Sequence, residues 1–300
     1  MQQDDKRLAS PIIFIGPGRS GSTIISEIIF AHETLAWPSN HLEYLPRVPL
    51  INLLRPLFDN RFWSLIGEKG QLNKTRRLNS LLPLPAEAFP FWEALTRPEI
   101  DFSRGFLLDQ VASAEERRRI RHTIARLVSW QGKQRFAMKL TGPGRIGYLQ
   151  SIFPDARFVN VVRDPVATVR SLQAVPFWKE LGMHRLWWTG AYSNAEINKF
   201  ESIRNDPVAA TAFQLAKVLK TTQQEALRCG ANMLTVRYEQ FVENPPQTIQ
   251  QICAFLDLSL SDSLQRKLAQ TTVHDRNRQK RVHDQNNAGT VLEIIGECGL

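Results

Sequence analysis

Residues 12–23 begin with the apolar run Ile12-Ile13-Phe14-Ile15 and continue with Gly16-Pro17-Gly18-Arg19-Ser20-Gly21-Ser22-Thr23. A short, continuous apolar run of this kind is typical of a buried parallel strand. The run ends at a glycine-rich loop, and residues 20–31 follow as an apolar-rich helical stretch. A strand, a glycine-rich loop and a helix in this order predict an α/β fold.

The loop has the spacing of a phosphate-binding loop, because five positions separate Gly16 from Gly21. Backbone N–H groups can then converge on an anion that also lies at the positive end of the following helix. The hydroxyls of Ser20, Ser22 and Thr23 add further donors. A glycine-rich turn that only caps the helix is the alternative interpretation.

The same loop argues against ATP hydrolysis. A nucleoside triphosphatase places a lysine directly after the second glycine, whereas this chain has Ser22 there and Arg19 inside the loop. The best candidate for a magnesium-binding strand reaches Arg163 before Asp164. We therefore expect metal-independent chemistry and no metal site.

Three further apolar runs predict strands at residues 136–140, 158–162 and 233–236. With residues 12–15 they predict a P-loop-like parallel β-sheet flanked by helices. Residues 40–106 are rich in proline, which favours short helices and loops, and we assign them to a lid insertion around residues 40–130. Near its end, Ser113 and Glu116 predict a capping box that begins a helix over residues 113–130.

A second phosphate signal follows the strand at residues 158–162. Arg163-Asp164-Pro165 comes directly after it, and Ser171 lies further along the helix that Pro165 would begin. An arginine at a strand end and a serine on the next helix can bind a second phosphate. Two phosphate sites predict a bisphosphate ligand.

Together the two motifs resemble the sulfotransferases that use 3′-phosphoadenosine 5′-phosphosulfate (PAPS). Residues 19–23 match the family's Arg-Ser-Gly-Ser/Thr-Thr loop, and residues 163–171 match its Arg-Asp-Pro motif with a following serine. Residues 139–143 look like its Lys-Thr-Pro segment with one residue inserted, and residues 236–245 like its Arg-Tyr-Glu-Asp-Leu segment. The resemblance covers about residues 11–258 and implies a P-loop-type parallel sheet.

The resemblance implies sulfuryl transfer from PAPS, as a co-substrate, to a hydroxyl or amine of an acceptor that the sequence does not identify. A glycan, a glycolipid and a small metabolite are all open. The alternatives are a P-loop small-molecule kinase and a catalytically silent nucleotide-binding protein of the same fold. The residues that would hold the 5′-phosphosulfate are Gly18, Arg19, Ser20, Gly21, Ser22 and Thr23, and those that would hold the 3′-phosphate are Arg163 and Ser171.

Three residues are candidates for catalysis. Lys139 matches the lysine of the Lys-Thr-Pro segment, which implies that it neutralises the leaving oxygen. For the general base we favour Glu43, in a region where several branches of the family keep a glutamate, with His41 as its rival because histidine titrates nearer neutrality. Glu87 and Glu93 are further alternatives, and the usual acidic residue beside a proline is not in clear register here.

The 300 residues carry a formal net charge of +9, which favours anionic partners. No helix-turn-helix, RNA-recognition or zinc-finger pattern indicates a nucleic-acid partner. Three widely spaced cysteines favour a reducing compartment, and the apolar runs are too short for a signal peptide or a membrane span. We therefore expect a cytoplasmic protein without stable membrane insertion, and the sequence leaves the oligomeric state open.

Three regions are expected along the chain. Residues 1–10 form a polar tail, residues 11–270 the sulfotransferase domain, and residues 271–300 a basic loop and tail of the same domain. By resemblance to the family, the basic loop would close over the nucleotide, with Arg276, Arg278 and Lys280 as the candidate contacts.

Overall fold

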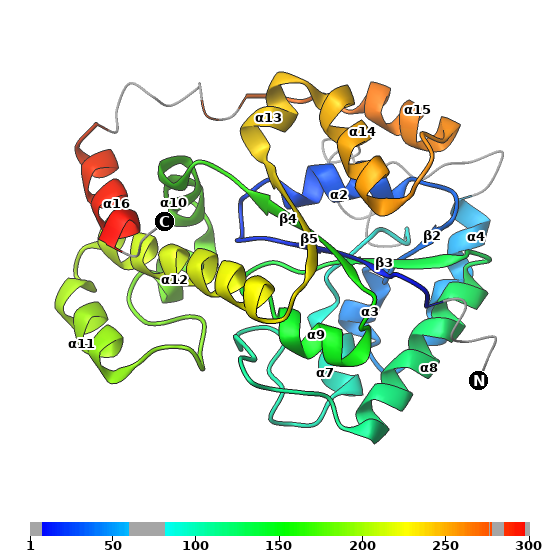
Figure 1. Cartoon of the computed structure of the whole chain (residues 1–300), viewed down its shortest axis with the longest axis horizontal. Helices are drawn as coiled ribbons and strands as arrows, with labels where there is room; N and C mark the ends of the chain where they lie inside the picture. The colour runs from blue at the N-terminus through cyan, green and yellow to red at the C-terminus, as the bar shows by residue number, and fades with distance from the viewer. Residues whose placement is uncertain (1–7, 60–81, 276, 278–284, 298–300) are drawn as a thin grey trace.

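The computed structural model describes residues 8–59, 82–275, 277 and 285–297. These residues form a five-stranded sheet with helices on both sides (Figure 1). All neighbouring strands pair in parallel, in the order β2-β3-β1-β4-β5. The predicted α/β fold is confirmed, and its strands are β1 (Ile12–Ile15), β2 (Leu35–Ala36), β3 (Arg135–Lys139), β4 (Arg157–Val162) and β5 (Asn232–Arg237).

Four of these strands coincide with the predicted apolar runs, and no observed strand end differs from the predicted one by more than one residue. The exception is β2, which the sequence does not predict. It consists of Leu35 and Ala36 alone, and its place comes from pairing with Arg135 and Phe136 of β3. A two-residue strand carries too little pattern to be recognised before its partner is known.

The central strand β1 divides the core into two layers. Ile13 and Ile15 belong to one buried cluster, whereas Ile12 and Phe14 belong to another. All four side chains are 0% exposed, so β1 is buried on both faces, as expected of a continuous apolar run in a parallel sheet.

Helices cover the two faces of the sheet, above and below it in Figure 1. The Ile12 and Phe14 face is covered by α2 (Ser22–Phe30), α14 (Pro245–Leu256) and α15 (Asp262–Gln270), with α13 (Tyr238–Glu243) between β5 and α14. The Ile13 and Ile15 face is covered by α7 (Phe89–Leu95), α8 (Ala114–Trp130) and α9 (Ile146–Ile152).

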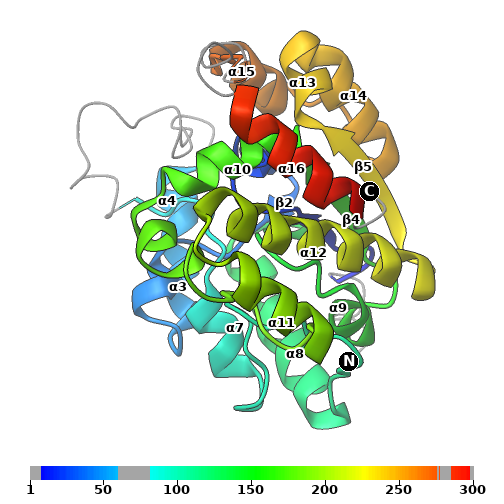
Figure 2. The same ribbon diagram turned by 90° about the vertical axis from the view of Figure 1, so that its left-hand side faces the viewer.

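A further group of helices packs beside the sheet. It contains α10 (Pro165–Gln173), the π-helix η2 (Trp178–Gly182), α11 (Asn194–Ile203), α12 (Pro207–Arg228) and α16 (Gln285–Glu297). α16 lies against α10 and α12 (Figure 2). The polar, basic composition around residues 271–287 gives no helix signal, so the sequence does not predict α16.

That residues 40–130 act as a lid stays a prediction, and we refer to the part before α8 as the lid segment. Its first part is α3 (His41–Tyr44), the 3₁₀-helix η1 (Pro49–Leu54) and α4 (Arg55–Phe58), in keeping with the proline-rich composition. α8, however, buries Ile120, Ile124 and Leu127 in the same cluster as Phe136 of β3, and therefore belongs to the layer that covers the sheet. The capping box of Ser113 and Glu116 is present at its start, as predicted.

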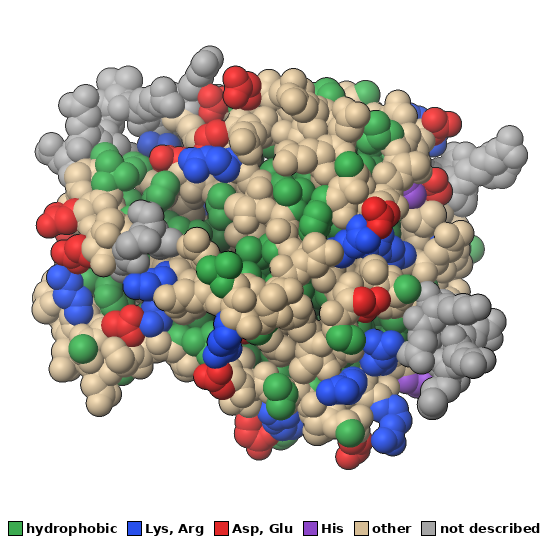
Figure 3. Space-filling view, in the orientation of Figure 1, with side chains coloured by type: hydrophobic (Ala, Val, Ile, Leu, Met, Phe, Trp, Pro, Cys, Tyr) green, Lys and Arg blue, Asp and Glu red, His purple; other side chains and the backbone are tan. Residues whose placement is uncertain are grey.

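The arginine cluster of α8 forms a solvent-facing helix surface. Arg117, Arg118 and Arg119 are all exposed, and Figure 3 shows Lys and Arg side chains at the lower right of the face in view, where Figure 1 places α8. These cations therefore contribute to the net charge from outside the core.

Candidate active site

The carboxyl ends of the parallel strands meet at one edge of the sheet, and the candidate residues gather there. The glycine-rich loop follows β1, Lys139 ends β3, and Arg163 follows β4. In open α/β sheets, ligands bind in the crevice outside the carboxyl ends of the strands. We therefore treat this edge as the candidate active site.

The glycine-rich loop has a backbone that requires glycine at two positions. Gly21 has a φ of +90°, and a Cβ there would lie 2.2 Å from Cδ2 of Tyr238. Gly16 has a φ of +148°, and a Cβ there would lie 2.3 Å from the carbonyl oxygen of Val161. Any larger residue would therefore displace β4 or the ring of Tyr238.

The end of this loop has the properties of an anion site. α2 begins at Ser22, directly after Gly21, and its first turn holds no acidic side chain. The Oγ atom of Ser20 is buried and has no hydrogen-bond partner among the described residues. Free donors and the positive end of a helix together suit a phosphate or sulfate group.

Arg19, Arg163 and Ser171 come together beside the loop. The Arg19 Nε atom donates to Oγ of Ser171 at 2.9 Å, and Nη1 of Arg163 donates to the Arg19 carbonyl oxygen at 3.1 Å. The guanidinium of Arg163 also lies over the ring of Tyr238, 4.9 Å from its centroid. Burial lowers the pKa of Arg163 from its ordinary value, although the guanidinium stays charged at any physiological pH.

Asn277 contacts Arg163 and is a residue that sequence reasoning misses. Its Oδ1 atom accepts from Nε of Arg163 at 2.9 Å and from Nη2 at 2.6 Å, and its Nδ2 atom donates to Glu239 Oε1 at 2.8 Å. Asn277 lies in the basic segment that was expected to close over the nucleotide. Arg276, Arg278 and Lys280, the candidates within that segment, lie outside the described residues.

Lys139 connects the loop to a carboxylate of the lid segment. Its Nζ atom donates to Oγ1 of Thr23 at 3.1 Å and lies 2.7 Å from Oε1 of Glu87. The second carboxylate oxygen of Glu87 accepts from Oγ1 of Thr141 at 2.7 Å and from its backbone N–H at 3.2 Å. Glu87 is thus an acidic residue in direct contact with Lys139.

Glu43 and His41, the two favoured candidates for the base, lie on α3. Glu43 Oε1 accepts from the backbone N–H of Ala88 at 2.8 Å, and the Nδ1 atom of His41 is buried without a partner among the described residues. Neither side chain makes a hydrogen bond or ion pair to Lys139 or to the glycine-rich loop within the described parts of the chain. The structure therefore does not bring them into contact with these groups.

Glu43 has an environment that favours its protonated form. Burial raises the pKa of its carboxyl, and the negative charges of Glu87 and Glu93 raise it further, while the hydrogen bond from Ala88 acts in the opposite direction. Two carboxylates in this region thus have different surroundings, since Glu87 is paired with a cation and Glu43 forms no ion pair with any described residue.

No group of three or more His, Cys, Asp or Glu residues is arranged to hold a metal ion in the part of the chain that the structure describes. None of the helices among the described residues is both long enough and apolar enough to cross a membrane.

Fold and site together define an α/β protein with a glycine-rich loop and several cations at the carboxyl edge of its sheet. A model of the Sulfotransferase family matches residues 11–262, and the chain therefore belongs to that family. The predicted resemblance to sulfotransferases is confirmed, and membership supports a sulfotransfer function.

Two curated proteins match shorter parts of the chain. Nodulation protein NoeE from Sinorhizobium fredii (strain NBRC 101917 / NGR234) is 32% identical over 115 residues, or 37% of this chain and 25% of NoeE. The mitochondrial alternative oxidase 1 from Candida albicans is 30% identical over 102 residues, or 30% of this chain and 26% of the oxidase. The chain thus matches about a quarter of each relative's length, so the activity of neither whole protein carries over.

Two solved structures share the fold. Sulfotransferase STF9 from Mycobacterium avium superposes with a TM-score of 0.55 at 17% identity, over 89% of this chain and 69% of STF9. Sulfotransferase STF1 from Mycobacterium tuberculosis H37Rv gives a TM-score of 0.50 at 16% identity, over 100% of this chain and 79% of STF1. At such identities the likeness supports the fold alone.

Proposed function

We propose that this protein transfers a sulfuryl group from PAPS to a hydroxyl or amine of an acceptor molecule. The observation that carries the proposal is the meeting of Arg19, Arg163 and Ser171 beside a glycine-rich loop at a helix N-terminus. PAPS has anionic groups at both its 5′ and 3′ positions. A loop for one group and an arginine and serine for the other match that charge distribution.

Within this proposal, residues 18–23 hold the 5′-phosphosulfate, and Arg163 and Ser171 hold the 3′-phosphate. Asn277 currently accepts from the guanidinium of Arg163, so the 3′-phosphate would take over or share those donors. The hydrogen bond between Arg19 and Ser171 would likewise open toward the ligand. No metal ion is needed for this binding mode, because cations of the chain face the anions.

Lys139 is the residue of this site best placed to assist the leaving group. Its Nζ atom lies 3.1 Å from Oγ1 of Thr23 in the first turn of α2, where the phosphate loop ends. As the sulfur–oxygen bond of the donor breaks, negative charge develops on the oxygen that remains with the phosphate. An ammonium fixed beside that oxygen stabilises the transition state more than the ground state.

The proposal is tested by calorimetric titration with 3′-phosphoadenosine 5′-phosphate (PAP), the product nucleotide. We expect micromolar binding to the wild-type protein and a weakening of about 1.5–3 kcal/mol, or roughly 10- to 150-fold, in Arg163→Ala. Arg204→Ala removes an arginine directly after α11 whose side chain is 51% exposed, and this matched control should bind PAP like the wild type.

The same titration separates the alternatives. A preference for ATP with Mg²⁺ over PAP would overturn the proposal in favour of a small-molecule kinase. Tight PAP binding without release of sulfate from PAPS, with or without a panel of glycan, glycolipid and small-molecule acceptors, would favour a catalytically silent nucleotide-binding protein.

A further inference from the structure

The ammonium of Lys139 is shared between the phosphate loop and a carboxylate. It lies 2.7 Å from Glu87 Oε1 and 3.1 Å from Thr23 Oγ1. The side chains of Lys139 and Glu87 are only 13% and 18% exposed, so water screens this ion pair less than a surface pair. The group that would face the leaving oxygen of the donor is therefore already bound to an acidic partner.

Glu87 is held firmly on its other side. Its Oε2 atom accepts from the hydroxyl and the backbone N–H of Thr141. The fully buried guanidinium of Arg145 in turn donates to the carbonyl oxygens of Thr141 and Pro143, at 3.3 and 2.8 Å. If Lys139 moved toward a ligand, the hydrogen bonds from Thr141 would keep the Glu87 carboxylate in place, and Oε1 could then accept a proton.

We propose that Glu87 is the general base and that donor binding activates it by drawing Lys139 from Glu87 to the leaving oxygen. The inference rests on the proposed function, because it takes the anion at the loop to be the phosphosulfate. It assigns the base to Glu87 and makes the activation of this base depend on donor binding. Glu43, which accepts from the backbone N–H of Ala88, then takes no part in proton transfer.

The transfer step balances with the groups present. The acceptor oxygen forms a bond to sulfur as the bond between sulfur and the phosphate oxygen breaks, and the electron pair of the broken bond stays on PAP, beside the Lys139 ammonium. The acceptor proton passes to Oε1 of Glu87 and then to water. The products are a sulfate ester, PAP and one proton.

Competition for Lys139 predicts that removing the carboxylate improves nucleotide binding. We expect Glu87→Gln to bind PAP about two- to fivefold more tightly than the wild type, since the ammonium no longer has an anionic partner. Glu99→Gln, a lid carboxylate that is 72% exposed, controls for the general loss of one negative charge and should leave the affinity unchanged. Unchanged or weaker binding in a folded Glu87→Gln protein would overturn the inference.

The role as base is measured separately through sulfate release from PAPS, with water as the acceptor and enzyme in excess. Glu87→Gln should lower the rate at least about 100-fold despite its tighter binding of PAP. Thr141→Val, which loosens Glu87 without removing it, should lower the rate less and leave PAP affinity unchanged. A full rate in Glu87→Gln, or a loss only in Glu43→Gln, would overturn the assignment.

The two proposals fail in different ways. If the wild-type protein does not bind PAP, the donor assignment is wrong and this inference is overturned with it. If the wild type binds PAP but Glu87→Gln binds it no more tightly, the donor assignment stands and the inference alone is wrong.

Discussion

Gly21 shows at the residue scale how the glycine-rich loop depends on the absence of one side chain. Its φ of +90° lies in the left-handed region, and the ring of Tyr238 occupies the space that a Cβ would need. Tyr238 also donates its hydroxyl to the carbonyl oxygen of His274 at 3.1 Å and lies under Arg163. A substitution at Gly21 that displaces the Tyr238 ring would therefore disturb both the glycine-rich loop and Arg163, and so both proposed phosphate sites.

Gly21→Ala should lower the free energy of unfolding by about 1–3 kcal/mol and weaken PAP binding at least about tenfold, because strain and overlap displace the Tyr238 ring. Urea denaturation and calorimetric titration measure the two effects. Gly132→Ala is the matched control, since Gly132 has a φ of +62° but no atom within 4 Å of the added Cβ. It should show a loss of stability from backbone strain with PAP affinity intact, and equal losses of affinity in both variants would contradict the argument.

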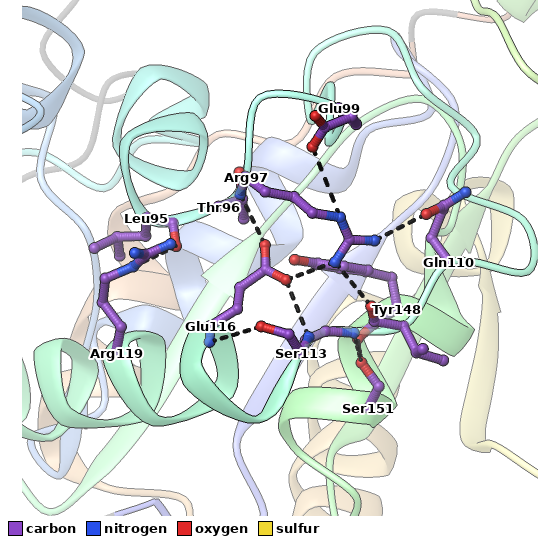
Figure 4. A network of polar contacts seen from close by, with 12 residues as sticks. Leu95, Thr96, Arg97, Glu99, Gln110, Ser113, Glu116, Arg119, Tyr148 and Ser151 are labelled. Carbon is purple, nitrogen blue, oxygen red and sulfur yellow. Dashed lines mark hydrogen bonds and ion pairs between the residues drawn. The ribbon is translucent and has the colours of Figure 1, made fainter.

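The N-terminus of α8 shows at the element scale how the lid segment is attached to the sheet layer. Glu116 accepts from the backbone N–H of Arg97 at 2.9 Å and from Nη1 of Arg97 at 2.8 Å, and it completes the capping box with Ser113 (Figure 4). Arg119, one turn further along, donates to the Leu95 carbonyl oxygen at the end of α7. One buried carboxylate thus fixes the start of α8 to the chain that leaves α7.

Glu116→Gln should lower the free energy of unfolding by about 1–3 kcal/mol at pH 7, because a neutral amide pairs poorly with three donors. Burial alone raises the pKa of Glu116, but the hydrogen bonds that its carboxylate accepts and the positive charge of Arg97 outweigh burial and leave the pKa below the ordinary value of 4.5. The carboxylate therefore stabilises the fold above pH 4.5, and this stability is lost as the pH falls through the lowered folded-state pKa.

Urea denaturation at pH 7 and at acidic pH checks this sign. The difference in the free energy of unfolding between the wild type and Glu116→Gln should become smaller as the pH falls. Glu115→Gln removes the exposed neighbouring carboxylate in the same first turn and should stay within about 0.5 kcal/mol of the wild type. If this difference in the free energy of unfolding instead grew toward low pH, the charge of Glu116 would not be the cause of the stabilisation.

Elements with a local signal could be predicted from the sequence, and those defined by contacts could not. β1, β4, the glycine-rich loop and the cap of α8 each have their pattern within a few consecutive residues. Glu87 instead meets Lys139 across 52 positions of sequence, and Asn277 meets Arg163 across 114. Such pairings depend on how the lid and the C-terminal segment pack, and no periodicity encodes that packing.

At the scale of the whole molecule, α16 connects the C-terminal segment to the helix that follows Arg163. α16 packs Val291, Ile294 and Ile295 into the cluster that also holds Val169 of α10. α10 begins directly after Arg163-Asp164 and carries Ser171, so the packing of α16 supports the helix that presents the proposed second phosphate site. That residues 271–300 belong to the same folding unit as the sheet stays a prediction, which this packing supports.

Val291→Ala tests that coupling. Val291 is 1% exposed, and its truncation should lower the free energy of unfolding by about 1–3 kcal/mol through lost burial and the cavity left behind. If the C-terminal segment shares one folding unit with the sheet, urea denaturation followed by tryptophan fluorescence and by far-UV circular dichroism should give one coincident transition, shifted to lower urea. Leu292→Ala, at a neighbouring position that is 57% exposed, should leave the transition within about 0.5 kcal/mol of the wild type. Two separate transitions would instead make α16 an independent appendage, and PAP affinity would then not respond to Val291→Ala.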